Sequence, residues 1–189
     1  MRRIVLLGLL SLMPGSLSAQ QRTLVDGPVR SGGYGAPVVK FGDVANLFGV
    51  WAGGRGGWIL NESFVIGGGG YGLTNQAHLA FDALEMGYGG LDLEWVNRPN
   101  ELVHVSLGVL VGGGGATYYP GNTLVGFYSG FFVAEPAVNI MLNVTPMFRI
   151  GVGATYRAVE SLSLPELTND DLSGFTGQLQ FKFGKFTGT

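Results

Sequence analysis

His104 and Ser106 are the two residues whose types and spacing could support a reaction. Residues two apart share one face of an extended strand, so the imidazole could take the proton of the hydroxyl. Nucleophilic catalysis also needs a third group that orients the base, and Glu135 is the carboxylate that we assign to that role. The chemistry of this trio would be that of a hydrolase with a serine nucleophile.

Metal, thiol, nucleotide and nucleic-acid chemistry are not indicated. His78 is the second histidine of the chain, and no further ligand lies near it in the sequence. The absence of cysteine excludes thiolate chemistry, disulfides and a lipoprotein anchor. The glycine runs are not followed by a helix, as a phosphate loop would require. Charge is sparse and nearly balanced, so no basic face suits nucleic acid. We therefore predict no metal and no cofactor.

The elements that would position the candidate trio follow from period-two alternation. In the last segment, Phe181 and Phe183 alternate with Gln180 and Lys182, whereas an amphipathic helix would need spacings of three and four. Similar alternation recurs along the chain. We predict about eight strands, at residues 33–42, 47–60, 63–73, 84–96, 102–119, 130–142, 147–158 and 174–186.

The phase of the alternation slips within the fourth predicted strand. Leu84, Met86 and Tyr88 share one face, and from Leu91 onward the apolar residues take the odd positions. One extra residue at Gly89-Gly90 would produce this change, so the pattern predicts a β-bulge there.

The predicted connections are of two kinds that alternate along the chain. The short ones are residues 61–62, 97–101 and 143–146, and the long ones are residues 73–83, 119–129 and 159–173. Only the first connection, near Asp43, is shorter than this rule suggests. Tight turns at one end and long loops at the other are typical of outer-membrane barrels. Since no later segment carries the apolar run of a membrane helix, a membrane protein of this kind must be a closed barrel. We predict an all-β fold, a closed antiparallel up-and-down transmembrane β-barrel.

Polar residues gather on the predicted inward face. They would form either a selective pore or proton path, or a network of ion pairs and hydrogen bonds that fills a narrow lumen. Eight strands enclose little space, and mixed charge signs favour pairing. We predict a lumen network of Arg55, Glu85, Asp92, Glu94, His104, Glu135, Asn139, Arg149, Arg157, Gln178, Gln180 and Lys182.

Aromatic residues concentrate near both ends of the predicted strands, as in the girdles that mark membrane interfaces. We assign to these girdles Trp58, Phe64, Trp95, Tyr118, Phe148, Tyr156, Phe183 and Phe186.

Runs of glycine are the most unusual feature of the composition, which includes 34 glycines. A two-residue turn at Asn61-Glu62 would place Gly56 opposite Gly67, so the runs gather on neighbouring strands. They either ease tight curvature in a small barrel, which we favour, or leave a shallow notch where a lipid, a ligand or another barrel comes close.

The N-terminus has the features of a secretory signal. Arg2 and Arg3 precede an apolar run over residues 4–13, which is too short to span a membrane as a helix, and small residues follow it. Cleavage after Ala19 or Ser18 fits the pattern. The predicted organisation is a signal peptide over 1–19, a linker over 20–32, a barrel over 33–186 and a tail over 187–189.

The region 33–186 resembles the small eight-stranded outer-membrane barrels of the OmpA/OmpX type. The resemblance rests on strand number, alternation, loop asymmetry and the aromatic-ended last strand from Gln178 to Phe186, which residues 187–189 follow. It implies a bacterial outer-membrane location, with outer-membrane lipid as surroundings and the barrel-assembly machinery as a partner during insertion. In that superfamily the terminal aromatic helps assembly.

Three functions are compatible with these features. We favour a non-enzymatic barrel that is structural, binds through its long loops or admits a small apolar molecule. The second is a lipid-modifying barrel enzyme that uses His104, Ser106 and Glu135. This trio is similar to that of some outer-membrane lipid A deacylases, but the surroundings of the motif differ, and the predicted topology places His104 inside the barrel at the short-turn end. The third is a secreted soluble β-protein, against which the outward Phe and Val residues argue.

Overall fold

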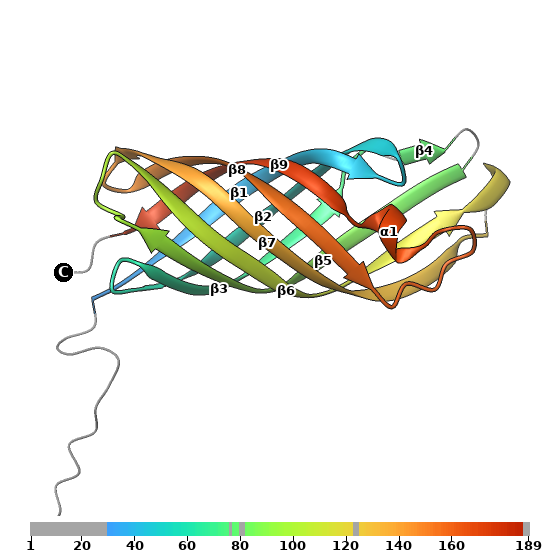
Figure 1. Ribbon diagram of the computed structural model, residues 1–189, viewed down its shortest axis with the longest axis horizontal. Helices are drawn as coiled ribbons and strands as arrows, with labels where there is room; N and C mark the ends of the chain where they lie inside the picture. Colours follow the sequence, from blue (N-terminus) through green and yellow to red (C-terminus); the bar gives the residue numbers. More distant parts are fainter. Residues whose placement is uncertain (1–29, 76, 80–81, 123–124, 187–189) are drawn as a thin grey trace, which may run out of the picture.

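A single antiparallel sheet closes on itself into a barrel (Figure 1). The computed structural model describes residues 30–75, 77–79, 82–122 and 125–186. The predicted signal peptide, the tail and nearly all of the linker lie outside these residues. The strands are β1 (Ser31–Val44), β2 (Leu47–Leu60), β3 (Phe64–Leu73), β4 (Ala77–Leu79), β5 (Asp82–Asn97), β6 (Val103–Tyr119), β7 (Phe127–Thr145), β8 (Phe148–Glu160) and β9 (Gly174–Lys185). Two short helices, η1 (Pro120–Asn122) and α1 (Asn169–Leu172), lie in connections.

Closure joins the first strand to the last. Each long strand pairs with its neighbours in the chain, β3 pairs directly with β5, and β1 pairs with β9. The three-residue strand β4 pairs with the beginning of β5 and is not part of the closed wall. The wall therefore has eight strands and leaves no unpaired edge, which confirms the predicted fold class.

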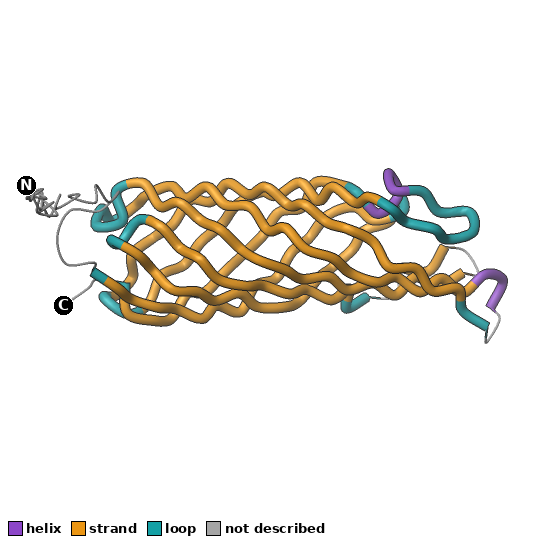
Figure 2. The backbone as a smooth tube through the Cα atoms, turned by 90° about the horizontal axis from the view of Figure 1, so that it is seen from below, coloured by secondary structure: helices purple, strands orange, loops and turns teal. Residues whose placement is uncertain are grey.

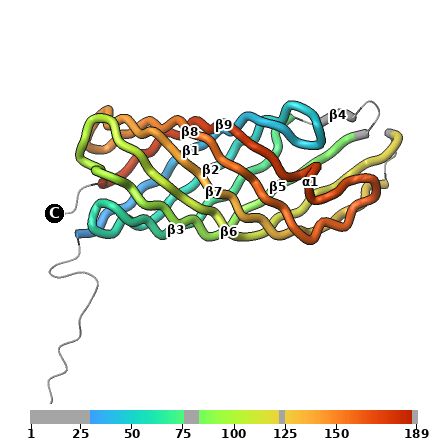
Figure 3. Tube along the Cα trace, in the orientation of Figure 1, coloured from blue at the N-terminus to red at the C-terminus, as the bar shows by residue number. Residues whose placement is uncertain are grey.

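The connections sort to the two ends of the barrel as predicted (Figures 2 and 3). The short-turn end carries residues 61–63, 98–102 and 146–147, together with both ends of the described chain. The long-loop end carries the connections that follow β3, β6 and β8. It also carries the tight β1–β2 turn, in which Ala45 and Asn46 both have positive φ, at 50° and 60°. Two such residues form the turn whose twist matches that of paired strands.

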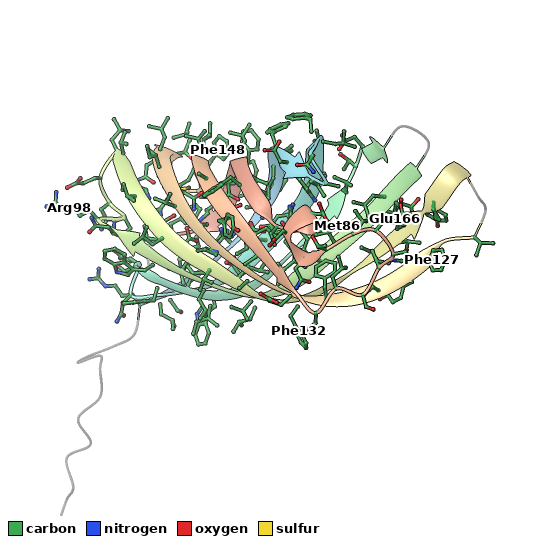
Figure 4. The ribbon with its side chains drawn as sticks, turned by 45° about the vertical axis from the view of Figure 1, so that its right-hand side comes forward. Met86, Arg98, Phe127, Phe132, Phe148 and Glu166 are labelled. Carbon is green, nitrogen blue, oxygen red and sulfur yellow. The ribbon has the colours of Figure 1, made fainter. Side chains whose placement is uncertain are left out.

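Side chains alternate between the wall's two faces. Along β9, Gln178, Gln180 and Lys182 are buried inside, while Phe175 and Phe183 are exposed on the outer surface. Figure 4 shows the same for Phe132 of β7, which points away from the barrel. The outer surface is therefore apolar along most of its height.

The predicted bulge at Gly89-Gly90 is wrong. The register of β5 with β3 and with β6 runs through these glycines without a shift. Leu84, Met86 and Tyr88 face inward, although they are apolar. The physical reason is that the lumen itself becomes apolar toward the long-loop end, so the inner face changes from polar to apolar without any change of register.

This apolar region forms a plug inside the long-loop end. Trp51, Tyr118 and Phe131 from the wall pack with Leu164 and Leu172 from the connection between β8 and β9. That connection contains α1 and folds back over the barrel (Figure 1). The plug thus combines wall residues with one loop that is distant from most of them in sequence.

The glycine runs lie side by side on β2, β3, β5 and β6. Gly56 pairs with Gly68 rather than with Gly67, because the turn between β2 and β3 includes Ser63 as a third residue. A Cβ atom added at Gly112 would collide with the backbone of Gly89 and Gly90, whereas one added at Gly70 would come no closer than 3.6 Å to another atom. Some of these glycines are therefore required by close packing of the backbone, and others are not.

The face assignment can be tested at Val152 of β8, which is 51% exposed on the outer wall. We expect Val152→Arg to lower the free energy of unfolding by about 2–4 kcal/mol, because a cation would then face the hydrocarbon. Urea unfolding in lipid vesicles and heat-modifiable migration on gels measure this, with Val152→Leu as the control. Equal insertion and stability of Val152→Arg and the parent would contradict the assignment.

Candidate functional site: the polar lumen

The structure buries every residue of the predicted lumen set except Glu85. These side chains come from six strands and meet only because the sheet closes. The prediction that Glu85 faces inward is wrong. Since β5 keeps a single register, Glu85 lies on the outer wall with Leu91 and Leu93.

Glu94 is the centre of the first cluster in the lumen. Lys182 from β9 approaches its two carboxylate oxygens at 2.6 and 2.7 Å, and Arg55 from β2 approaches one of them at 3.2 Å. Arg55 also pairs with Asp92 at 2.6 Å. The hydroxyl of Tyr34 donates to Glu94 at 3.0 Å. Two cations and two carboxylates thus neutralise each other across the barrel.

Glu135 is the centre of the second cluster. It forms an ion pair with Lys40, and the hydroxyl of Tyr88 donates to it at 2.5 Å. The Lys40 ammonium also lies 3.4 Å from the centre of the Tyr71 ring. Sequence reasoning missed Lys40 because its inward neighbours in β1 are apolar. The cost of exposing a charge to lipid could have revealed it. A lysine that faces lipid at mid-membrane costs about 2–4 kcal/mol, so Lys40 is expected to face inward.

Arg157 binds a connection to the wall instead of pairing with a carboxylate. It donates to the backbone carbonyls of Leu172 at 2.6 Å and Asp43 at 3.2 Å, and its guanidinium lies 4.4 Å from the centre of the Trp51 ring. These contacts tie the connection that carries α1 to the end of β1. Arg157 thereby helps hold the apolar plug in place.

Arg149 performs the same task at the short-turn end. It donates to the carbonyl of Pro99 at 3.2 Å and lies 4.0 Å from the centre of the Phe186 ring. Among the described residues, no carboxylate forms an ion pair with Arg149 or Arg157.

Uncharged polar side chains occupy the space between these groups. Gln178 donates to Asn139 at 2.5 Å, and Asn139 donates to the Ser106 hydroxyl at 3.4 Å. The amide of Gln180 is fully buried and has no hydrogen-bond partner within the described part of the chain.

The candidate catalytic trio does not come together. The Nδ1 atom of His104 lies 3.2 Å from the carbonyl oxygen of Glu101, and its Nε2 atom makes no hydrogen bond to any described residue. Ser106 contacts Asn139, and Glu135 is held by Lys40 and Tyr88. His104 therefore makes no hydrogen bond to the Ser106 hydroxyl, and Glu135 does not orient His104. Within the described ranges there is also no group of three His, Asp or Glu residues that could hold a metal ion.

The predicted interface aromatics divide into two groups. Those exposed on the outer wall are Trp58, Phe64, Trp95, Tyr156 and Phe183. Phe148 is half-buried and stacks on Phe183, with ring centres 4.7 Å apart. The assignment of Tyr118 and Phe186 to the girdles is wrong, because both lie inside. Tyr118 belongs to the apolar plug, and Phe186 packs on Tyr34 and Arg149.

Solved structures with the same architecture include three bacterial surface proteins. The N-terminal β-barrel domain of Pseudomonas aeruginosa OprF has a TM-score of 0.57 and 9% identity, over 83% of this chain and 99% of that domain. Neisserial surface protein A has a TM-score of 0.56 and 12% identity, over 82% of this chain and 96% of that protein. Ail, the attachment invasion locus protein of Yersinia pestis, has a TM-score of 0.52 and 14% identity, over 82% of this chain and 98% of that protein.

This chain has the fold of the small outer-membrane barrels. All three proteins are eight-stranded outer-membrane barrels of the OmpA/OmpX type, so the predicted resemblance is confirmed and the predicted location agrees with theirs. No protein-family model and no curated protein matches the sequence of this chain. No helix in the described part of the chain is long and apolar enough to cross a membrane.

The charge cluster can be tested by neutralising Glu94. We expect Glu94→Gln to lower the free energy of unfolding by about 3–5 kcal/mol, because Lys182 and Arg55 would remain buried with one carboxylate fewer. Urea unfolding in lipid vesicles, followed by tryptophan fluorescence, measures the change.

The matched control is Glu101→Gln, which removes an exposed pair with Arg98 of 3.3 Å at the short-turn end. That pair should contribute at most about 1 kcal/mol. If both variants were as stable as the parent, the Glu94 cluster would not stabilise the barrel.

Proposed function

We propose that this chain is a non-enzymatic protein of the bacterial outer membrane that carries its long connections to the cell surface on a barrel with a filled lumen. The observation that supports this most directly is the division of the two faces. Charged residues from different strands pair inside, while Phe, Val, Ile and Leu cover the outside. A soluble barrel would need the opposite arrangement.

The lumen supports a role without conduction. The Glu94 and Glu135 clusters cross the interior, and the apolar plug occupies it toward the long-loop end. At the short-turn end, Arg149 and Phe186 lie on each other inside the barrel. An eight-stranded barrel has room for such side chains and for little else.

The absence of a working trio supports the non-enzymatic role over the lipid-modifying enzyme. His104 is buried near the short-turn end, and its Nδ1 atom contacts the backbone carbonyl oxygen of Glu101. Lipid headgroups of the outer leaflet would lie at the opposite end. Transport of a small apolar molecule along the lumen would have to displace the charge clusters.

We assign recognition to the long connections, since loops on a rigid scaffold commonly carry binding. Residues 159–173 contain Glu160, Glu166, Asp170 and Asp171 and no Lys or Arg. Ail has been solved with the heparin analogue sucrose octasulfate, a polyanion. The acidic connection of this chain does not suit such a ligand, and we favour a hydrated surface here.

The first test concerns conduction. We expect the purified barrel, inserted in planar bilayers, to give no steady ion current, because its interior is filled by paired side chains. The refolded protein should be checked for heat-modifiable migration before the measurement. Steady currents as large as those of general porins would reject the filled lumen.

The second test concerns orientation. The chain contains no cysteine, so single cysteines can be placed at Asp170 in the long-loop end and at Glu101 in the short-turn end. Both side chains are exposed. We expect a membrane-impermeant maleimide to label Asp170→Cys on intact cells and Glu101→Cys only after lysis. The reverse pattern would invert the barrel and remove the long connections from the cell surface.

A further inference from the structure

A hollow in the outer wall lies near the long-loop end and differs in polarity from the rest of that surface. It has a volume of about 510 Å³ and is lined by Leu73, Thr74, Glu85, Met86, Gly87, Gly115, Thr117 and Tyr128. Figure 4 labels Met86, which lies in the part of the barrel toward the long-loop end. Of the inward-facing residues described above, Met86 is the one that lines it. It is therefore a separate feature of the molecule.

The strands bring the polar side chains of the hollow into one row. Glu85 of β5 pairs with Thr117 of β6, and Thr117 pairs with Tyr128 of β7. Neighbouring strands lie about 4.8 Å apart, so the carboxylate, the hydroxyl and the phenol follow one another across the wall. One row toward the middle of the barrel, Gly87 pairs with Gly115. Gly87 leaves space there, because an added Cβ atom would come no closer than 3.5 Å to another atom.

Among the described residues that line the hollow, Glu85 is the one that carries a charge. It is exposed, and no hydrogen bond or ion pair joins it to another described residue. A carboxylate on the outer wall of a membrane barrel is costly without a counter-charge. The charge of the hollow is thus complementary to a cation.

Tyr128 gives the hollow an aromatic wall. A Cβ atom added at Gly115 would lie 2.8 Å from the Cε2 and hydroxyl atoms of Tyr128, so the ring lies over that glycine. Tyrosine rings attract ammonium groups through the negative face of the ring. A carboxylate, a hydroxyl acceptor and an aromatic face together are the groups that recognise an organic ammonium.

We propose that this hollow binds the ammonium group of an amine, with Glu85 as its counter-ion, Thr117 as a hydrogen-bond acceptor and Tyr128 as its aromatic wall. The amine has two sources, the headgroup of a membrane lipid or a small soluble amine. The position of the hollow relative to the membrane surface rests on the proposed function. The charge and the lining residues of the hollow do not depend on it.

The soluble source is tested by NMR titration of the nitrogen-15-labelled full barrel in maltoside micelles. Ethanolamine is the probe, and glycerol is the uncharged control. We expect ethanolamine to shift the backbone amides of Glu85, Thr117 and Tyr128, and Glu85→Gln to weaken its binding by about fivefold. Asp170→Asn, which removes an exposed carboxylate of the same end, should leave the binding unchanged.

The lipid source is tested by native mass spectrometry of the barrel released from bilayers of equal phosphatidylethanolamine and phosphatidylglycerol. We expect preferential retention of phosphatidylethanolamine, lost in Glu85→Gln and in Tyr128→Leu and kept in Asp170→Asn. Binding in either arm that depends on Glu85 supports the site and identifies its source.

Two outcomes would overturn the proposal. One is equal behaviour of Glu85→Gln and the parent in both arms, with both proteins heat-modifiable on gels. The other is an equal response to ethanolamine and glycerol together with equal retention of the two lipids. Neither outcome bears on the filled lumen or on the labelling of Asp170→Cys, so the proposed function is judged separately.

Discussion

The pairing of β1 with β9 is the interaction on which the rest of the structure depends. In hydrocarbon, an open sheet edge would leave backbone N–H and C=O groups without hydrogen bonds, each at a cost of several kcal/mol. Closure removes both edges at once. It also brings inward residues from all strands within reach of one another, because a barrel of eight strands is only wide enough for its own side chains.

The polar interior follows from that narrowness. Buried charges are tolerated only when they are paired and hydrogen-bonded. Glu94 and Glu135 meet this condition with cations from strands that are distant in sequence, namely Lys182, Arg55 and Lys40. The two arginines without carboxylates, Arg149 and Arg157, instead bind backbone carbonyls and aromatic rings near the two ends. The same side chains that neutralise the lumen therefore also fasten its connections.

The two faces of the wall suggest different tasks. The inside is occupied by contacts among its own side chains, which favours the filled lumen that we propose. The outside is apolar and is interrupted near the long-loop end by the hollow around Glu85. Binding by this protein is thus expected at its long connections and at that hollow, while the lumen provides stability.

The sequence by itself determined the number of long strands, their approximate bounds, the asymmetry of the connections and most of the inward residues. These depend on a period of two and on turn composition, which are local properties. Closure decided the rest. Leu84, Met86 and Tyr118 face inward because the lumen is apolar where the connection with α1 folds into it, and Phe186 faces inward because Tyr34 and Arg149 are there. Glu85 was predicted to face the lumen but lies on the outer wall. Lys40 was not predicted there but pairs with Glu135 inside the barrel. Alternation tells which residues share a face, but only contacts between distant strands tell what that face meets.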